Sequence, residues 1–557
     1  MTSIRRFSAC LLFAATLAAQ DKVTIRVDAG AVIGPWSPVF RYFGYDEPNY
    51  TYMEHGRKLV GELTALAPVP VYFRAHSLLV TGDGQPALKW GSTNVYTEDA
   101  AGKPVYDWTI VDRIFDTYLT AKGRPMVEIG FMPQALSVKP EPYKHNWPKT
   151  DLQAGWAYPP KDYGKWAELV YQWVKHCVER YGKAEVESWW WELWNEPDIF
   201  YWTGTPEEYD KLYDYTADAV KRALPTARVG GPATTGPRGA KSSAYLRQFL
   251  DHCTRGTNAV TGKTGAPLDF VSFHSKGSPK VVSGHVEMGT APELADLNNG
   301  FAIVASYPAL ASLPVIVSEW DPEGCAACSA RTYPQNAYRN TTLYPANRAV
   351  VFNAALQLAD KYKIKLEGLL TWAFEFEGQP YFDGFRTLAT NGVDKPVLNF
   401  FRMAGLMGGN RVKVTSTGAL GTDAMLRSGV REKPDIDALA TANGREITVM
   451  AWNYHDEEAP AAAAPVEVVV EGIPSTATRV LLKHYRIDER HSNAYTAWKA
   501  MGSPQNPTPE QYARLEAAGQ LELLGSPRWL WTDKGTVRIE LTLPRQGISL
   551  LQLTQFR

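Results

Sequence analysis

Between about residues 40 and 405, short apolar segments alternate with segments of helical periodicity, and this alternation limits the possible folds more than any other feature. The segments 162–182 and 205–224, for example, carry apolar residues at spacings of three and four, as a helix with one buried face does. Such alternation favours a mostly parallel sheet with a helix between successive strands. Eight segments are typical of strands: 41–47, 71–77, 125–131, 188–196, 228–233, 268–275, 314–320 and 368–374.

Eight strands with crossover helices predict a (β/α)8 barrel, or TIM barrel, which we assign to residues 37–410. A doubly wound open sheet is the main alternative. It is disfavoured because the sequence lacks the GxGxxG and P-loop signatures that would support it. The chain has 557 residues, more than one ordinary core holds, so at least one further domain is expected.

After about residue 411 the pattern changes to strand-like segments separated by turns, which predicts a β-sandwich domain over 411–557. A helical insertion is expected near 493–519, where Thr508 can cap a helix whose first turn contains Pro509. The early segment 21–36 contains one strand, which is expected to join this second sheet. The strand-like segments of the domain are 445–455, 466–473, 478–488 and 536–544.

Residues 1–20 have the composition of a secretory signal peptide, with Arg5 and Arg6 before the apolar run 7–18. That run is too short to span a bilayer, and no later segment has about 18 unbroken apolar residues. We therefore expect a secreted, soluble protein. The net charge of −1 gives no reason to expect a nucleic acid or a membrane as partner. In an oxidising compartment, Cys325 and Cys328 could close a local disulfide.

Catalytic side chains of a TIM barrel lie at the carboxyl ends of its strands and in the loops that follow. Two carboxylates facing each other there can hydrolyse a glycosidic bond, because one protonates the leaving oxygen while the other attacks the anomeric carbon. A metal hydrolase could use similar side chains, but the sequence has no HExxH motif or tight cluster of ligands, so we expect no metal. The side chains at predicted strand ends are His76, Glu196, His274, Glu319 and Trp372.

Glu196 belongs to the stretch WWWELWNEPD, and its neighbours distinguish it from an ordinary surface glutamate. Asn195 precedes it, and tryptophans flank it; burial beside tryptophan would raise the pKa of a carboxyl group, as an acid catalyst requires. Strand alternation places Glu192, Trp194 and Glu196 on one side of the strand, with Glu192 one layer deeper. We interpret Glu196 as the reactive carboxylate and Glu192 as structural support.

The same stretch closely resembles the signature of glycoside hydrolase family 39, part of a clan of retaining (β/α)8 glycosidases. The resemblance implies that Glu196 is the acid/base, that Glu319 is the nucleophile, and that no cofactor is needed. It covers nearly the whole chain after the signal peptide. The segments that carry it, besides 189–198, are 107–136, 228–233, 314–324 and 483–520.

The family contains β-xylosidases and α-L-iduronidases, and the sequence resembles both. Lys276, in a segment similar to the iduronidases, matches a lysine that contacts the sugar carboxylate there, and Arg386 matches an iduronidase arginine. The segment 371–379 is closer to the xylosidases, in which a tryptophan and a glutamate contact sugar hydroxyls. That likeness implies the same contacts for Trp372 and Glu377.

Both basic residues also have simpler interpretations. Lys276 could contact the nucleophile and keep Glu319 ionised, and Arg386 could belong to a salt bridge within its loop. His76 and His274 could be satisfied core histidines, although their positions at paired strand ends favour contact with the sugar.

The sequence therefore predicts a secreted retaining exo-glycosidase that removes terminal β-D-xylosyl or α-L-iduronosyl-like residues by double displacement. In this mechanism Asn195 would hydrogen-bond the sugar 2-hydroxyl. The alternatives are an endo-acting glycanase of the same clan, which would need an open groove, and a non-catalytic carbohydrate-binding protein. The expected partner is an oligosaccharide or glycoside, and the sequence leaves the oligomeric state open.

Overall fold

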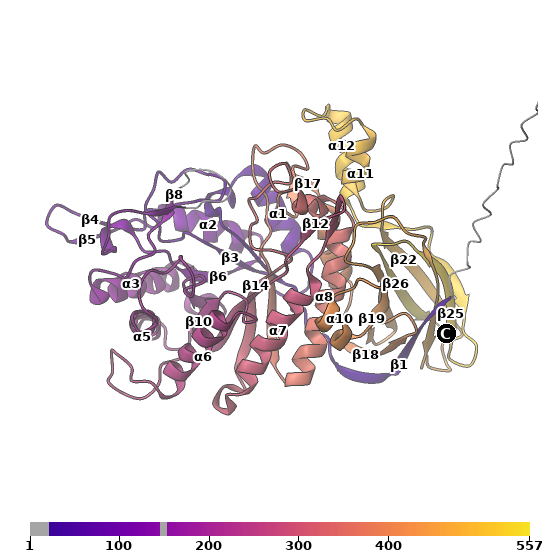
Figure 1. Cartoon of the computed structure of the whole chain (residues 1–557), viewed down its shortest axis with the longest axis horizontal. Coiled ribbons are helices and arrows are strands. Elements are labelled where there is room, and N and C mark those ends of the chain that lie inside the picture. Colours follow the sequence, from indigo (N-terminus) through magenta and orange to yellow (C-terminus); the bar gives the residue numbers. More distant parts are fainter. Residues whose placement is uncertain (1–21, 145–152, 557) are drawn as a thin grey trace, which may run out of the picture.

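The computed structural model describes residues 22–144 and 153–556, which form a barrel domain and a second, mostly antiparallel domain (Figure 1). In the described part of the chain, eight strands close into a barrel in the order β10-β11-β14-β15-β2-β3-β6-β9, and every pair is parallel. The predicted TIM barrel is confirmed. Its strands are β2 (Tyr42–Tyr45), β3 (Tyr72–Ala75), β6 (Arg124–Ile129), β9 (Trp190–Leu193), β10 (Arg228–Thr234), β11 (Phe270–Lys276), β14 (Pro314–Asp321) and β15 (Lys365–Thr371).

A helix follows each barrel strand and packs on the outside of the ring (Figure 1). Local sequence sets where the helices begin: Asp162 caps one of them by accepting from two backbone N–H groups, and Thr205 and Glu208 form a capping box at another. These helices are α1 (Glu54–Thr64), α2 (Thr109–Thr120), α3 (Tyr163–Tyr181), α5 (Pro206–Ala223), α6 (Ala240–Arg255), α7 (Thr290–Ala305), α8 (Leu343–Tyr362) and α9 (Pro396–Gly405).

The loops at the carboxyl ends of the strands carry small hairpins, whereas the loops at the opposite end are short. This elaboration marks the carboxyl end as the functional face of the barrel. The hairpins are β4 (Tyr96–Glu98) with β5 (Pro104–Tyr106), β7 (Tyr143–Lys144) with β8 (Gln153–Gly155), β12 (Lys280–Val282) with β13 (His285–Glu287), and β16 (Ala389–Thr390) with β17 (Val393–Asp394). Short helices are η1 (Pro48–Tyr50), η2 (Gln134–Leu136), α4 (Lys183–Val186), η3 (Pro308–Leu310) and η4 (Pro334–Asn340).

The second domain is the predicted β-sandwich, made of one ten-stranded sheet in the described residues. The early strand β1 pairs antiparallel with β18 and parallel with β21, so the start of the described chain lies in the second domain. The sheet contains β1 (Val23–Pro35), β18 (Asn410–Ser416), β19 (Asp435–Asn443), β20 (Glu446–Tyr454), β21 (Ala464–Glu471), β22 (Arg479–Ile487), β23 (Glu522–Leu523), β24 (Arg528–Trp531), β25 (Val537–Leu543) and β26 (Gly547–Phe556), with helix α10 (Thr422–Ser428) after β18.

The helical insertion consists of α11 (Ala494–Ala500) and α12 (Pro509–Gly519), which project from the sandwich toward the barrel loops (Figure 1). The Thr508 side chain caps α12, as its sequence predicts. Trp498 of α11 packs against Phe382, in the loop after β15, with ring centroids 5.1 Å apart. The second domain therefore supports a loop at the carboxyl end of the barrel.

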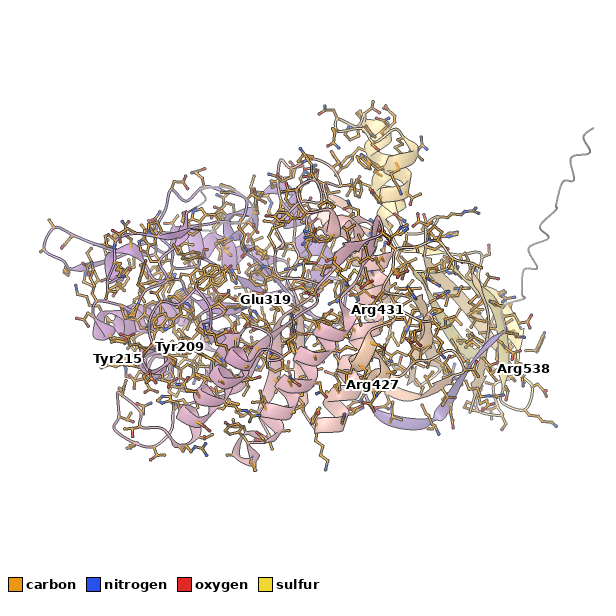
Figure 2. All side chains as sticks on the ribbon, in the orientation of Figure 1. Tyr209, Tyr215, Glu319, Arg427, Arg431 and Arg538 are labelled. Carbon is orange, nitrogen blue, oxygen red and sulfur yellow. A yellow bond between two sulfur atoms is a disulfide. The ribbon has the colours of Figure 1, made fainter. Side chains whose placement is uncertain are left out.

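The sequence also predicts a signal peptide, no membrane-spanning segment and a possible local disulfide. The signal peptide lies outside the described residues. Across 22–144 and 153–556, no helix has the length and apolarity that a bilayer crossing would need. Cys325 and Cys328, in the loop after β14, form a disulfide. Figure 2 labels Glu319 within the barrel domain and Arg538 on the sandwich.

Candidate active site

The barrel interior is layered, with an apolar floor below a charged layer. The floor contains one large side chain from most strands: Tyr42, Tyr72, Met126, Trp190, Phe270, Ile316 and Leu370. Two residues further along three neighbouring strands, alternation puts Arg74, Glu128 and Glu192 into the next layer, all fully buried. The guanidinium of Arg74 pairs with Glu192 through Nε and with Glu128 through Nη2 at 2.9 Å. Glu192 therefore has the supporting position expected for it.

Glu319 lies directly above this layer because the ladder between β11 and β14 contains one extra residue. Phe273 pairs with Val317 and His274 pairs with Glu319, so Ser318 has no partner of its own in the ladder. Such a bulge reverses the facing of the residues that follow. Ile316 faces the barrel interior, and the bulge turns Glu319 inward as well, while Trp320 packs in the outer core.

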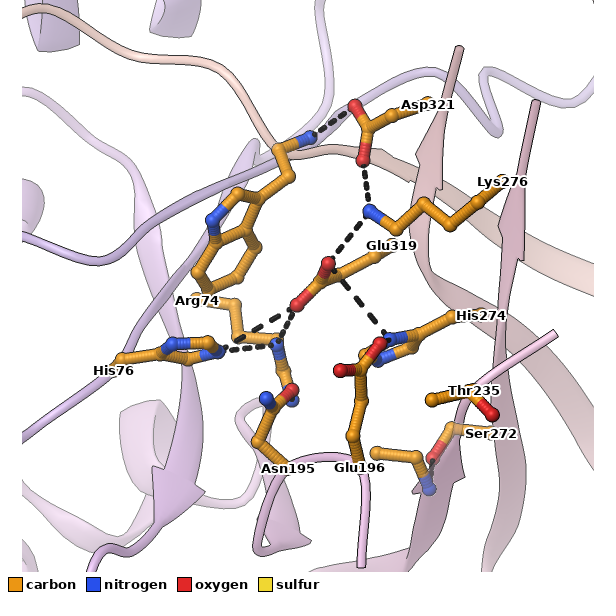
Figure 3. A network of polar contacts seen from close by, with 12 residues as sticks. Arg74, His76, Asn195, Glu196, Thr235, Ser272, His274, Lys276, Glu319 and Asp321 are labelled. Atoms are coloured by element: carbon orange, nitrogen blue, oxygen red, sulfur yellow. Dashed lines mark hydrogen bonds and ion pairs between the residues drawn. The ribbon is translucent and has the colours of Figure 1, made fainter. Parts of the chain in front are cut away.

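Basic side chains surround the Glu319 carboxylate on both oxygens (Figure 3). Lys276 Nζ lies 2.6 Å from Oε2, and His274 Nδ1 lies 3.7 Å from the same oxygen. Arg74 Nη1 and His76 Nε2 lie 3.4 Å and 3.6 Å from Oε1. Burial alone would raise the pKa of Glu319, but the charges of His274, Lys276 and His76 outweigh it and hold that pKa well below its usual range.

Glu196 reaches the site from a loop of unusual backbone geometry. Strand β9 ends at Leu193, and both Trp194 and Glu196 have positive φ, at 66° and 45°. Strained backbone of this kind is concentrated at functional sites. The Glu196 carboxylate lies at the mouth, by which we mean the open carboxyl end of the barrel, and 15% of its side chain is exposed. Its Oε1 lies 2.9 Å from His274 Nδ1 (Figure 3).

The expected alternation of Glu192, Trp194 and Glu196 along one side of the strand fails after Leu193. Trp194 turns outward and packs at a T-shaped angle on Phe131 and Trp202, and its Nε1 donates to the Tyr201 carbonyl. The physical reason is the positive φ of Trp194, which ends the extended backbone on which alternation depends.

The two carboxylates approach each other closely. One oxygen of Glu196, one oxygen of Glu319 and a ring nitrogen of His274 all lie within 4.8 Å of one another. Three such atoms could hold a metal ion. However, the ammonium of Lys276 and the guanidinium of Arg74 already contact Glu319, and their positive charges oppose a divalent cation there. The arrangement therefore suits a pair of carboxylates acting on a bond between them.

Three further predicted residues lie in the same network. His76 Nδ1 is 2.9 Å from Asp46 Oδ1, and its ring centroid lies 4.1 Å from that of Trp372. Asn195 accepts from Arg74 Nη2 through Oδ1 at 3.2 Å, which fixes the orientation of its amide. The structure thus brings together six of the predicted residues, counted over the described chain, around Glu319.

Lys276 and Arg386 are both engaged by protein carboxylates. Lys276 Nζ bridges Glu319 and Asp321, with 2.6 Å to each. The Arg386 side chain is fully buried; it pairs with Glu323 and lies 3.5 Å from Asp321, and its Nε donates to the Trp372 carbonyl at 2.9 Å. Arg386 therefore supports the loop from below and is not exposed at the barrel opening.

Glu377 contacts the start of α1, the helix that follows the neighbouring strand β2. Its Oε1 accepts from the backbone N–H of His55 at 2.9 Å, in the first turn of α1, where no side chain of the helix itself provides a cap. Contact between Glu377 and the sugar stays a prediction of the family resemblance.

Several residues of the site were missed by the sequence reasoning: Asp46, Arg74, Lys89, Glu128 and Asp321. Arg74 and Glu128 could have been found, since a charge in the middle of a buried parallel strand needs a partner or a function. Asp321 follows Glu319 by two residues and shares its face. Lys89 comes from a loop, where no periodic pattern marks it.

A (β/α)8 barrel with two carboxylates meeting at the carboxyl ends of its strands defines the protein as a glycoside hydrolase. The model of the glycosyl hydrolases family 39 matches residues 87–523. The chain belongs to glycoside hydrolase family 39.

Known relatives differ in the substrates that their names give. A beta-xylosidase from Geobacillus stearothermophilus is 29% identical over 526 residues, which cover 91% of this chain and 90% of that protein. An alpha-L-iduronidase from Mus musculus is 25% identical over 544 residues, 91% of this chain and 77% of that one. The crystal structure of a monomeric beta-xylosidase from Caulobacter crescentus CB15 has the same fold, with a TM-score of 0.74, 22% identity and coverage of 96% of this chain and 100% of that chain.

Proposed function

We propose that the protein is a retaining exo-glycosidase that removes terminal β-D-xylosyl residues. The observation that carries the proposal is the spacing of Glu196 and Glu319, whose nearest carboxylate oxygens lie within 4.8 Å. Retaining glycosidases hold their carboxyl groups about 5–5.5 Å apart, whereas inverting enzymes need about 6.5–9.5 Å to admit a water molecule.

In this mechanism Glu319 attacks the anomeric carbon while Glu196 protonates the leaving oxygen, and a glycosyl-enzyme forms. Glu196 then takes a proton from water, which displaces the sugar from Glu319. The basic side chains around Glu319 keep it ionised for the attack. Asn195, whose amide oxygen accepts from Arg74, keeps its amide nitrogen as a donor for the sugar 2-hydroxyl.

The charges of the site favour a neutral sugar over a uronic acid. A carboxylate on the sugar would need an available cation, but Lys276 already bridges Glu319 and Asp321. Arg386 is buried and paired with Glu323. An iduronide carboxylate would have to displace one of these protein carboxylates, and a xyloside would not.

Exo-action is proposed from the family resemblance, and it would require a pocket that holds a single terminal sugar. An endo-acting enzyme would need an open groove on both sides of the scissile bond. We also propose that the protein is exported to the periplasm or the extracellular space. The Cys325–Cys328 disulfide is consistent with an oxidising compartment.

The variant Glu319→Gly tests the reaction directly. It should lose turnover of 4-nitrophenyl β-D-xyloside, and added azide should restore part of it by occupying the space of the missing carboxylate. The product should be the glycosyl azide of inverted configuration, identified by NMR, whereas wild-type protein should give none. Undiminished turnover without azide, or wild-type hydrolysis of 4-methylumbelliferyl α-L-iduronide in preference to the xyloside, would contradict the proposal.

A further inference from the structure

A second lysine lies at the mouth, on the side away from Lys276. Lys89 comes from the loop between β3 and β4, and its side chain is only 5% exposed. Its Nζ lies 2.7 Å from Oδ2 of Asp46, which directly follows β2. The other oxygen of Asp46 contacts His76, which in turn lies 3.6 Å from Glu319. One imidazole therefore separates this ion pair from the nucleophile.

Several contacts of the loop hold Lys89 against Asp46. Lys89 has φ of 65°, a left-handed backbone conformation that costs energy for a residue other than glycine. Its backbone N–H donates to Glu47 at 2.5 Å. Further along, Asn49 and Ser92 exchange two hydrogen bonds of 3.0 Å. Strain that is held in place by several contacts is typical of a functional position.

The order of strands shows which end of a bound sugar would face this pair. The Glu196 backbone N–H donates to the Ala233 carbonyl of β10, so Glu196 lies against that strand. In the closed ring, β2 stands directly opposite β10. Because Glu196 must reach the leaving oxygen, the leaving group lies on its side. The part of the ring remote from the anomeric carbon then points toward Asp46 and Lys89.

We propose that Asp46 and Lys89 bind the hydroxyl groups at C3 and C4 of the terminal sugar and select for an equatorial 4-hydroxyl. The carboxylate accepts from a hydroxyl and the ammonium donates to one, so the pair is complementary to two adjacent hydroxyls. The assignment rests on the proposed function and deepens it, because it names the groups that recognise the non-reducing end.

The inference predicts a change in selectivity between two epimers. Aryl α-L-arabinopyranoside differs from aryl β-D-xylopyranoside only in the configuration at C4. We choose the variant Lys89→Asn, because asparagine tolerates positive φ better than most residues. Its kcat/KM for 4-nitrophenyl β-D-xylopyranoside should fall by about 10- to 100-fold, as expected when a hydrogen bond from a charged donor is lost. Its kcat/KM for the arabinopyranoside should fall by much less, because only a contact with the shared 3-hydroxyl can be lost there.

Lys122→Asn is the matched control, since Lys122 also has positive φ, at 66°, and is exposed. It should leave both rate constants unchanged. Equal losses on the two epimers in Lys89→Asn would overturn the inference, because a merely structural ion pair does not distinguish them. If Lys89→Asn does not fold, wild-type protein tests the same point with aryl 4-deoxy-β-D-xyloside. A loss of about 10-fold or more supports the inference, and full activity overturns it.

The outcome can be separated from the proposed function. If the wild-type protein hydrolyses the xyloside but the epimer ratio is unaffected in Lys89→Asn, only the role of Asp46 and Lys89 is wrong. If the wild-type protein hydrolyses neither aryl glycoside, the proposed function is wrong and this inference fails with it.

Discussion

The two sides of the barrel mouth hold their carboxylates in opposite ways. Glu319 projects from within β14 and is surrounded by Lys276, His274, Arg74 and His76, with 7% of its side chain exposed. Glu196 projects from a loop, is twice as exposed at 15%, and has His274 as its ion-pair partner. One carboxylate is fixed among positive charges, and the other is held by one imidazole at the edge of the mouth.

This difference matches the two chemical tasks that we propose for Glu319 and Glu196. A nucleophile must be ionised whenever substrate arrives, and several fixed cations achieve this. An acid/base must carry a proton in one step and take one up in the next, so strong stabilisation of either protonation state would slow one half of the cycle. The His274 ring lies between the two carboxylates and contacts both of them.

The largest effect that separates the two sides is expected for Glu196→Ala. With a poor leaving group such as phenol, kcat/KM should fall by about 10²- to 10⁴-fold, since protonation of the leaving oxygen is lost. With 2,4-dinitrophenol, which leaves without protonation, kcat/KM should fall far less.

The exposed Glu207→Ala, on α5, is the control and should behave as the wild type. Steady-state kinetics across a series of aryl β-D-xylosides measure the dependence. A loss that is the same for every leaving group would contradict the role of Glu196 as the acid.

An intermediate effect is expected for Lys276→Met on the other side. The positive charge of Lys276 lowers the pKa of Glu319, so its removal should raise that pKa. Because Glu319, as the proposed nucleophile, must be ionised to attack, the acidic limb of the pH profile of kcat/KM should move to higher pH, by about one unit or more. The exposed Lys280→Met, in the same barrel loop, should leave the limb unchanged. A profile that does not move would show that the other cations suffice.

The periodicity of the sequence predicted the strands that carry the site, but it did not predict that the Glu319 side chain points into the barrel. All eight barrel strands were found because each is a short apolar run followed by a helical one. Glu319 lies near the end of β14 as expected, whereas Glu196 lies in the loop after β9, which ends at Leu193 rather than at the predicted residue 196. However, simple alternation from Ile316 would turn Glu319 outward. The extra residue Ser318 turns it inward, and that bulge depends on the register with β11, a neighbour that the local sequence of β14 does not reveal.

The partners of the charged residues were predicted less well for a similar reason. The family resemblance identified Lys276 and Arg386, but it could not indicate which carboxylates surround them. Asp321 and Glu323 come from the strand end that carries Glu319, whereas Arg386 comes from a loop more than sixty residues later. Lys89 is held by a strained turn and by long-range bonds, and neither has a signature in sequence.

The smallest effect on catalysis is expected for Glu377→Gln, a change outside the group of residues around Glu196 and Glu319. The carboxylate accepts from the His55 N–H at the amino terminus of α1, where a negative charge is favourable. We expect a loss of about 0.3–1 kcal/mol in the free energy of unfolding, measured by urea denaturation, because glutamine can still accept the hydrogen bond but lacks the negative charge. KM for the xyloside should change little. A rise of about tenfold in KM with unchanged stability would instead support the sugar contact that the family resemblance implies.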